Sequence, residues 1–220
     1  MMEKELNIGL YASALFTICI IALDISYLFL FANPNPWTGF DHYVSNYSFI
    51  EVWPEVIGFI LLPSFVITIY SIIQANNLEK SIVAKTSIFF AQAFVVVVSI
   101  GYFIQFAVVY PNIHSGSGRL YELWLFGNTS YSLAWALNYL GWFWSGLSTI
   151  FLAFAIKDKV LQKLFVLYGA LLSLAFVGYC TKFEKLEMVL GLAWFVVLPV
   201  AFIRVTILFS RLLKGKIQTI

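Results

Sequence analysis

Asp24 is the one carboxylate in the apolar run "IIALDISYLFLF", residues 20–31. On a helix, Ser13, Thr17, Asp24 and Tyr27 share one face, and most of the opposite face is Leu, Ile and Phe. If this run crosses a membrane, the acid is expected to face protein, because a charged group in lipid is costly. It then serves either as a hydrogen-bonding residue between helices or as part of a site for a cation, a proton or a polar head group.

The composition indicates that the run does lie in a membrane. Of the 220 residues, 61% are hydrophobic and only 11% are charged, and the mean hydropathy is +0.90. Such a chain has too little polar surface to cover a soluble globule. We therefore expect an integral membrane protein with the lipid bilayer as its main partner. The net charge of +2 is small, and no nucleic-acid partner is expected.

The apolar runs predict an all-α fold, a polytopic transmembrane helical bundle formed by one domain, residues 1–220. Six spans are expected, at about residues 8–31, 56–73, 87–109, 133–156, 164–179 and 188–209. The run at 164–179 is the shortest, so a count of five stays open. With the N-terminus inside, only Arg119, Lys182 and Lys185 of the 13 Lys and Arg residues fall outside. The positive-inside rule then predicts a multi-pass cell-membrane protein with both termini cytoplasmic.

In this topology the two long loops, residues 32–55 and 110–132, are both outside. Each is interrupted by Pro and Gly and then becomes rich in aromatic residues, which predicts a short helix or turn in the interface. Counted from the outer ends of the spans, Asp24 lies about 10 Å deep at 1.5 Å per residue. Gln105 and Asn138 lie at a similar depth, so three helices are expected to bring polar groups together there.

These positions define a candidate ligand site. Its expected members are Asp24, Tyr27, Gln105, Asn138, Trp142, Glu55 and Arg119. Glu55 has an alternative explanation, because it follows Pro54 at the start of the second span, where the helix dipole favours an acid. Arg119 is included because the second outer loop can fold back toward Asp24. Without such a cation, Asp24 is expected to be neutral and hydrogen-bonded to Gln, Asn or Tyr.

The fourth predicted span carries a stripe of small and polar residues. Ala134, Asn138, Gly141, Ser145 and Ser148 recur at intervals of four and three residues, which places them on one helix face. Small residues let helix backbones approach closely in lipid. The stripe therefore predicts close helix packing and a central place for this span in the bundle.

Several chemistries lack the residues that they need. The only histidines are His42 and His114, one in each long loop, which excludes a bis-histidine haem pair inside the bundle. Cys19 and Cys180 lie at different depths and give no redox pair. The chain has no glycine-rich phosphate loop, no G-x-S-x-G and no H-E-x-x-H. No cofactor and no metal are expected.

Three stretches resemble a known group. "GYFIQFAVVYPNIHSG" and "SLAWALNYLGWFWSGLSTIFLA" resemble the third and fourth spans of small six-span prokaryotic integral membrane proteins of unknown function. "GFDHYVSNYSFIEVWPEVIGFILLPSFV" is similar to the first outer loop and second span of the same family. The resemblance implies a six-helix architecture, and it implies no activity.

Three functions are compatible with these observations. The first is a non-catalytic binding or accessory protein, working alone or with a partner membrane subunit, whose outer-leaflet pocket takes a lipid or small amphiphile. The second is a small proton-coupled transporter, in which Asp24 changes its protonation. The third is an intramembrane enzyme acting on a lipid or sterol, which needs a second acid such as Glu55 or Glu51 near Asp24. We favour the first.

Overall fold

The computed structural model describes residues 2–115, 118–126, 132–215 and 219–220, and the described residues form helices and turns without any strand. Six helices are long: α1 (Met2–Ala32), α3 (Trp53–Ala75), α4 (Ile82–Ile104), α6 (Leu133–Ala153), α7 (Lys159–Thr181) and α10 (Leu198–Leu213). The shorter elements are α2 (Phe40–Ser45), η1 (Phe49–Glu51), η2 (Gln105–Val109), α5 (Tyr110–Asn112), η3 (Gly118–Trp124), α8 (Glu184–Glu187), α9 (Val189–Leu192) and η4 (Ala193–Val197).

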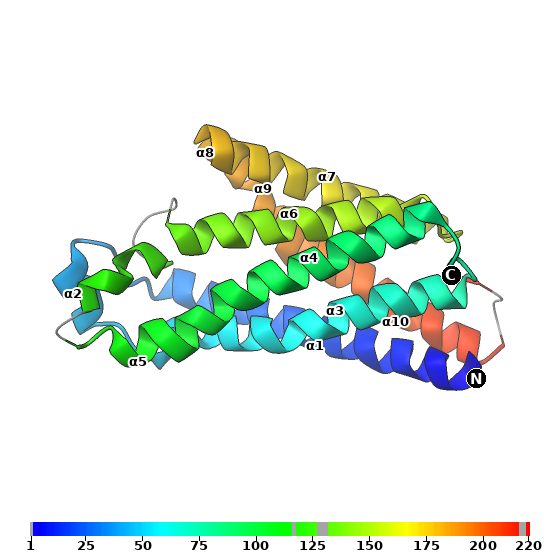
Figure 1. Ribbon diagram of the computed structural model, residues 1–220, viewed down its shortest axis with the longest axis horizontal. Coiled ribbons are helices and arrows are strands. Elements are labelled where there is room, and N and C mark those ends of the chain that lie inside the picture. The colour runs from blue at the N-terminus through cyan, green and yellow to red at the C-terminus, as the bar shows by residue number, and fades with distance from the viewer. Residues whose placement is uncertain (1, 116–117, 127–131, 216–218) are drawn as a thin grey trace.

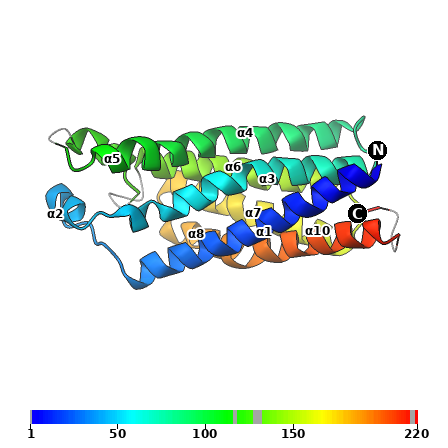
Figure 2. The ribbon, with the colours of Figure 1, turned by 90° about the horizontal axis from the view of Figure 1, so that it is seen from below.

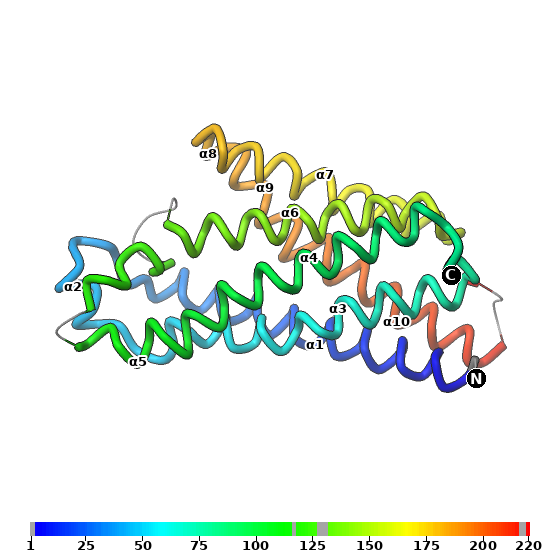
Figure 3. Tube along the Cα trace, in the orientation of Figure 1, coloured from blue at the N-terminus to red at the C-terminus, as the bar shows by residue number. Residues whose placement is uncertain are grey.

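The long helices run alternately up and down, so that both chain ends lie at the same end of an elongated bundle (Figures 1 and 2). We call this the termini end, and we call the opposite end, which carries α2 and α5, the α2 end. Successive long helices pack in antiparallel pairs, α1 with α3, α3 with α4, α4 with α6 and α6 with α7. Figure 3 shows how the last part of the chain turns back through α8, after which α10 closes the bundle against α1.

Among the described residues, five helical stretches are long and apolar enough to cross a membrane. They are Glu3–Ala32, Phe49–Ala75, Ile82–Asn112, Lys159–Thr181 and Glu184–Leu213. The expectation of an all-helical bundle is thus confirmed, and the five stretches are compatible with a multi-pass membrane protein, but the count of six spans is not confirmed. The remaining predicted span corresponds to α6, which is a 21-residue helix. Its apolar character is diluted by the polar and small residues that it buries against its neighbours.

Side-chain caps and proline explain where several helices begin. Ser81, Ser132 and Asp158 each accept a hydrogen bond from a backbone N–H three residues later, at the starts of α4, α6 and α7. Such caps satisfy a donor that the first helical turn leaves free. Pro54 lies in the first turn of α3, where the missing N–H has no cost. Helix α7 ends at Lys182, which adopts a left-handed conformation with φ 56°.

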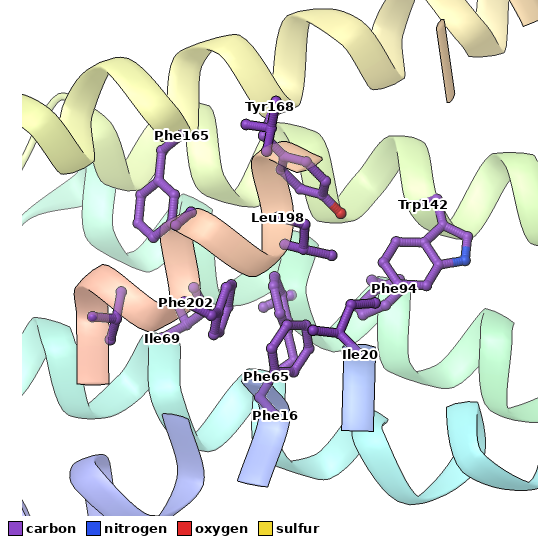
Figure 4. Close-up of a cluster of buried hydrophobic side chains, with 14 of the residues drawn as sticks. Phe16, Ile20, Phe65, Ile69, Phe94, Trp142, Phe165, Tyr168, Leu198 and Phe202 are labelled. Carbon is purple, nitrogen blue, oxygen red and sulfur yellow. The ribbon is translucent and has the colours of Figure 1, made fainter. Parts of the chain in front are cut away.

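The centre of the bundle is built from aromatic side chains (Figure 4). Phe16, Phe65 and Phe202 meet there with ring centroids 3.9–5.8 Å apart, and Phe94 packs between Phe65 and Trp142. Many large aliphatic side chains point outward instead, including Ile18 at 65% exposed and Ile25 at 61%. An exterior this apolar is unusual for a soluble protein and suits contact with lipid.

The stripe on α6 packs as the sequence predicts. All five of its residues are buried. A Cβ atom on Gly141 would lie 2.2 Å from Val98 Cγ2 of α4, so only glycine allows this approach. Near the termini end, the Ser87 hydroxyl donates to the Ser148 carbonyl at 2.8 Å. The stripe is therefore a close-packed surface, as expected; it faces mainly α4, and Ser145 forms a hydrogen bond with Tyr168 of α7.

Two helices contain a widened, π-helical turn at the same end of the bundle. These turns are η2 (Gln105–Val109) and η4 (Ala193–Val197), and each ends with the two valines of the pattern Val-Val-x-Pro, whose proline is Pro111 or Pro199. Proline supplies no N–H to the preceding turn and its ring crowds the carbonyl four residues back. A π-helical turn relieves this crowding, and such turns are frequent at functional sites.

Candidate functional site

A cavity of about 240 Å³ lies among the ends of the helices at the α2 end. Eight of its fourteen lining residues are aromatic, and the polar ones are acids and amides. The lining residues are Tyr27, Leu30, Phe31, Pro34, Asn35, Tyr43, Tyr47, Glu51, Glu55, Gln105, Phe126, Trp135, Trp194 and Phe195. Of these, only Phe31 and Pro34 are highly exposed, so they mark the side on which the cavity opens.

The two π-helical turns both contribute to the walls. Gln105 is the first residue of η2, and its Nε2 donates to the Trp124 carbonyl at 2.6 Å, which ties α4 to the loop helix η3. Trp194 and Phe195 belong to η4. The sequence pattern that precedes both prolines thus shapes two sides of the same cavity.

One wall of the cavity is acidic. Glu55, in the first turn of α3, is 2% exposed, and its Oε2 atom has no hydrogen-bond partner among the described residues. Its carboxylate interacts with its own backbone N–H, and Glu51 of η1 lies near enough to interact with it electrostatically. Glu51 is also in contact with the Asn35 side chain, whose Nδ2 donates to the Tyr43 carbonyl at 3.1 Å. Thus a buried acceptor without a donor lines the cavity.

Two tyrosines of the first long loop cover this acidic wall. Tyr43 and Tyr47 are 3% and 6% exposed, and their ring centroids lie 5.6 Å apart. Burial raises the pKa of both phenols far above the usual value, and the nearby carboxylates of Glu51 and Glu55 raise the pKa of each further. Both side chains therefore stay neutral at physiological pH and keep an O–H group to donate.

A hydrogen-bonded cluster lies directly behind the cavity. Tyr27 lines the cavity and interacts with Tyr102 of α4 and with Glu55. The Tyr102 hydroxyl donates to Asn138 Oδ1 at 3.2 Å, and Trp142 Nε1 donates to the same oxygen at 3.0 Å. Asn138 and Trp142 thus position Tyr102 and contact the site only indirectly.

Trp194 connects this cluster to the cavity wall. Its ring stacks on Tyr27 with a centroid distance of 6.0 Å, and it packs against Trp142 at 4.9 Å. The side chain is 5% exposed, and no described residue forms a hydrogen bond with its indole Nε1. A second buried polar group at the site, this one a donor, is therefore also left without a protein partner.

Asp24 faces the bundle as the sequence predicts, since it is 7% exposed. It lies one helical turn before Tyr27 and interacts with it electrostatically, but it does not line the cavity. In the part of the chain that the structure describes, its Oδ1 atom has no hydrogen-bond partner. The expected bonds from Gln105 and Asn138 are not made to this atom, because Gln105 donates to Trp124 and Asn138 belongs to the Tyr102 cluster.

Arg119 lies away from the other members of the predicted site. Its guanidinium donates to Asp41 at 2.9 Å, both side chains are more than two-thirds exposed, and it lies over the ring of Phe40. This pair links η3 to α2 at the surface. The structure thus gathers Tyr27, Glu55 and Gln105 in the cavity wall, and Asn138 and Trp142 behind it.

The sequence interpretation missed several lining residues, among them Tyr43, Tyr47 and Trp194. One signal for the tyrosines was present, because Tyr43, Tyr47, Glu51 and Glu55 recur at every fourth position. A second was the repeated Val-Val-x-Pro pattern, whose two valines end the π-helical turns that hold Gln105 and Trp194.

Comparisons with known proteins identify no relative of this chain. No protein-family model matches the chain, and no curated protein and no solved structure matches it either. What the protein binds must therefore be inferred from the cavity itself.

Proposed function

We propose that this is a six-span membrane protein, with both termini in the cytoplasm, that binds a lipid or other amphiphile in the cavity at its α2 end without transforming it. The observation that best supports this proposal is a largely aromatic cavity in which a buried carboxylate oxygen, Glu55 Oε2, has no hydrogen-bond partner among the described residues. Mostly apolar concave sites with a few converging polar groups are typical of small-molecule binding. A polar ligand group in the cavity would satisfy both Glu55 Oε2 and Trp194 Nε1.

The orientation is supported by the placement of charge and of chain ends. Both termini lie at one end, and this end also carries the basic segments around Lys80, Lys157 and Lys214. Helix α6 has 21 residues, which at 1.5 Å per residue is about the thickness of the hydrocarbon core. With six spans and basic loops inside, the cavity lies at the outer face of the membrane.

The size of the cavity favours a head group over a whole lipid. Sites for drug-sized ligands commonly measure roughly 300–1,000 Å³, and this cavity holds about 240 Å³. Its exposed lining residues, Phe31 and Pro34, lie at the end of α1, where a lipid tail can leave along the apolar outside of the bundle. A ligand with a compact polar head and an apolar tail fits this arrangement.

Filling the cavity tests the proposal. Leu30 lines the cavity, whereas Leu28 on the same helix is 56% exposed on the outer face. Native mass spectrometry of protein released from membranes in mild detergent should show a bound amphiphile in the wild type and in Leu28→Trp. The adduct should be lost in Leu30→Trp. A wild type without any adduct, or equal adducts in all three proteins, would overturn the proposal.

A further inference from the structure

The charge of the cavity is one-sided. Glu51 and Glu55 are its only acidic or basic lining residues, and no Lys, Arg or His is among the fourteen. Arg119 is the cation of the neighbouring loop helix η3, and it is paired with Asp41 at the surface. An anionic head group would thus meet two carboxylates with no cation to offset them.

Glu55 needs a partner that the described protein does not provide for its Oε2 atom. A carboxylate that is 2% exposed has lost almost all contact with water, and a buried charge is tolerated when it is paired and hydrogen-bonded. Since the atom lines an accessible cavity, a ligand cation can supply the missing partner. The phenols of Tyr43 and Tyr47 interact electrostatically with both carboxylates and stay neutral, so they add no positive charge to offset them.

The aromatic walls specify what kind of cation fits. The face of an aromatic ring attracts an ammonium group, most strongly where water is excluded. Tyr27, Trp135 and Trp194 come from three different helices and line the same cavity as the acidic wall. A metal ion prefers a shell of oxygen, nitrogen or sulfur ligands, and the described part of the chain holds no group of three or more His, Cys, Asp or Glu side chains that suits one.

We propose that the cavity selects amphiphiles whose head is an organic cation, with the ammonium group held between Glu55 and the aromatic walls. This inference rests on the proposed function, because it names the ligand class of the same cavity. It also explains why two acids and a ring of aromatic side chains occur together at a site that is otherwise apolar.

The test compares heads of different charge on the same tail. The probes are dodecyltrimethylammonium, its neutral carbon isostere 2,2-dimethyltetradecane and dodecyl sulfate, each titrated into the purified protein in dodecyl maltoside and followed by native mass spectrometry. We expect the cation to bind at least about tenfold more tightly than the isostere, since a desolvated cation–π contact alone is worth this much. Dodecyl sulfate should bind more weakly than either.

Two matched variants assign the selectivity to Glu55. Glu55→Gln should lower the preference for the cation about tenfold, because it removes the charge that pairs with the ammonium group, and it should leave the neutral isostere unaffected. Glu79→Gln, an exposed acid at the termini end, should change neither. If Glu55→Gln fails to fold, the ratio measured on the wild type still decides the question.

The outcomes separate the two proposals. If the cation and the isostere bind equally and Leu30→Trp blocks both, the head preference is refuted while the binding function stands. If dodecyl sulfate binds best, the inference is refuted in the same way. If Leu30→Trp blocks none of the probes, the cavity is not their site and the proposed function falls as well.

Discussion

The ion pair between Asp158 and Arg204 should hold the termini end of the bundle together. Arg204 Nη2 lies 2.6 Å from Asp158 Oδ2, and Arg204 Nε donates to Oδ1 at 3.4 Å. Asp158 also caps α7 by accepting from the Leu161 N–H at 2.8 Å. The pair joins the start of α7 to α10, so that removing it should loosen the contact between these helices. The pair can be removed by either of two substitutions. Asp158→Asn keeps the cap, because Asn is as good an N-cap as Asp, and Arg204→Met keeps most of the apolar stem of the arginine side chain.

The size of the effect follows from the burial of the pair. Exposed ion pairs contribute about 0.2–1 kcal/mol, and hydrogen bonds to charged groups contribute about 1.5–3 kcal/mol. The two side chains are only 27% and 16% exposed. We therefore expect a coupling free energy of about 2 kcal/mol from a double-mutant cycle, measured by unfolding in mixed detergent micelles. Arg211→Met, at an exposed position of α10, is the control and should have little effect.

The same pair predicts a pH dependence. Partial burial acts to raise the pKa of Asp158, but the hydrogen bonds and charge of Arg204 and the bond from Leu161 outweigh it and hold the pKa below its ordinary value of 3.8. A carboxyl group with a lowered folded-state pKa stabilises the fold above its unfolded pKa and loses this contribution as the pH falls through the folded value. The coupling should be constant at neutral pH and disappear in acid. A coupling below about 0.5 kcal/mol at neutral pH would refute the estimate.

Three further predictions concern packing, surface charge and topology. Gly169→Ala should destabilise the bundle by about 1–3 kcal/mol, because a Cβ there would lie 2.5 Å from a backbone carbonyl of α6, whereas Gly191→Ala has no neighbour nearer than 3.8 Å and should be tolerated in the same unfolding assay. Arg119→Met should lower the unfolding free energy by less than about 1 kcal/mol and leave probe binding unchanged. In a cysteine-free background, Ser45→Cys should react with an impermeant maleimide on intact cells, and Lys157→Cys should react only after permeabilisation; the reverse pattern would invert the proposed orientation.

The helices and the packing surface of α6 were predictable from the sequence because they depend on local periodicity. Asp24 was correctly placed toward the protein for the same reason, since its side of α1 follows from helix geometry alone. The same polar residues explain why α6 is not among the five stretches that are apolar enough to cross a membrane. The side chains that let it pack at the centre of the bundle also lower its mean hydropathy.

The cavity was not predictable in the same way. Its acidic wall forms only where the first long loop folds back, with Tyr43 and Tyr47 set against Glu51 and Glu55. Such contacts depend on tertiary structure and leave only a weak spacing signal. The partner of Arg119 was not predictable either, because a long cationic side chain can reach several acids. In the structure it pairs with Asp41 of the neighbouring loop.

Asp24, the residue that stands out most in the sequence, should act on a ligand only through Tyr27. It lies one turn away from Tyr27 and interacts with it electrostatically, yet it does not line the cavity. Asp24→Asn should therefore change the affinity for dodecyltrimethylammonium by no more than about threefold, and this change should vanish in a Tyr27→Phe background. Glu55→Gln should retain its larger effect in that background. A loss for Asp24→Asn that equals the loss for Glu55→Gln and survives Tyr27→Phe would mean that Asp24 contacts the ligand directly, and the acidic wall would then extend deeper into the bundle than the cavity does.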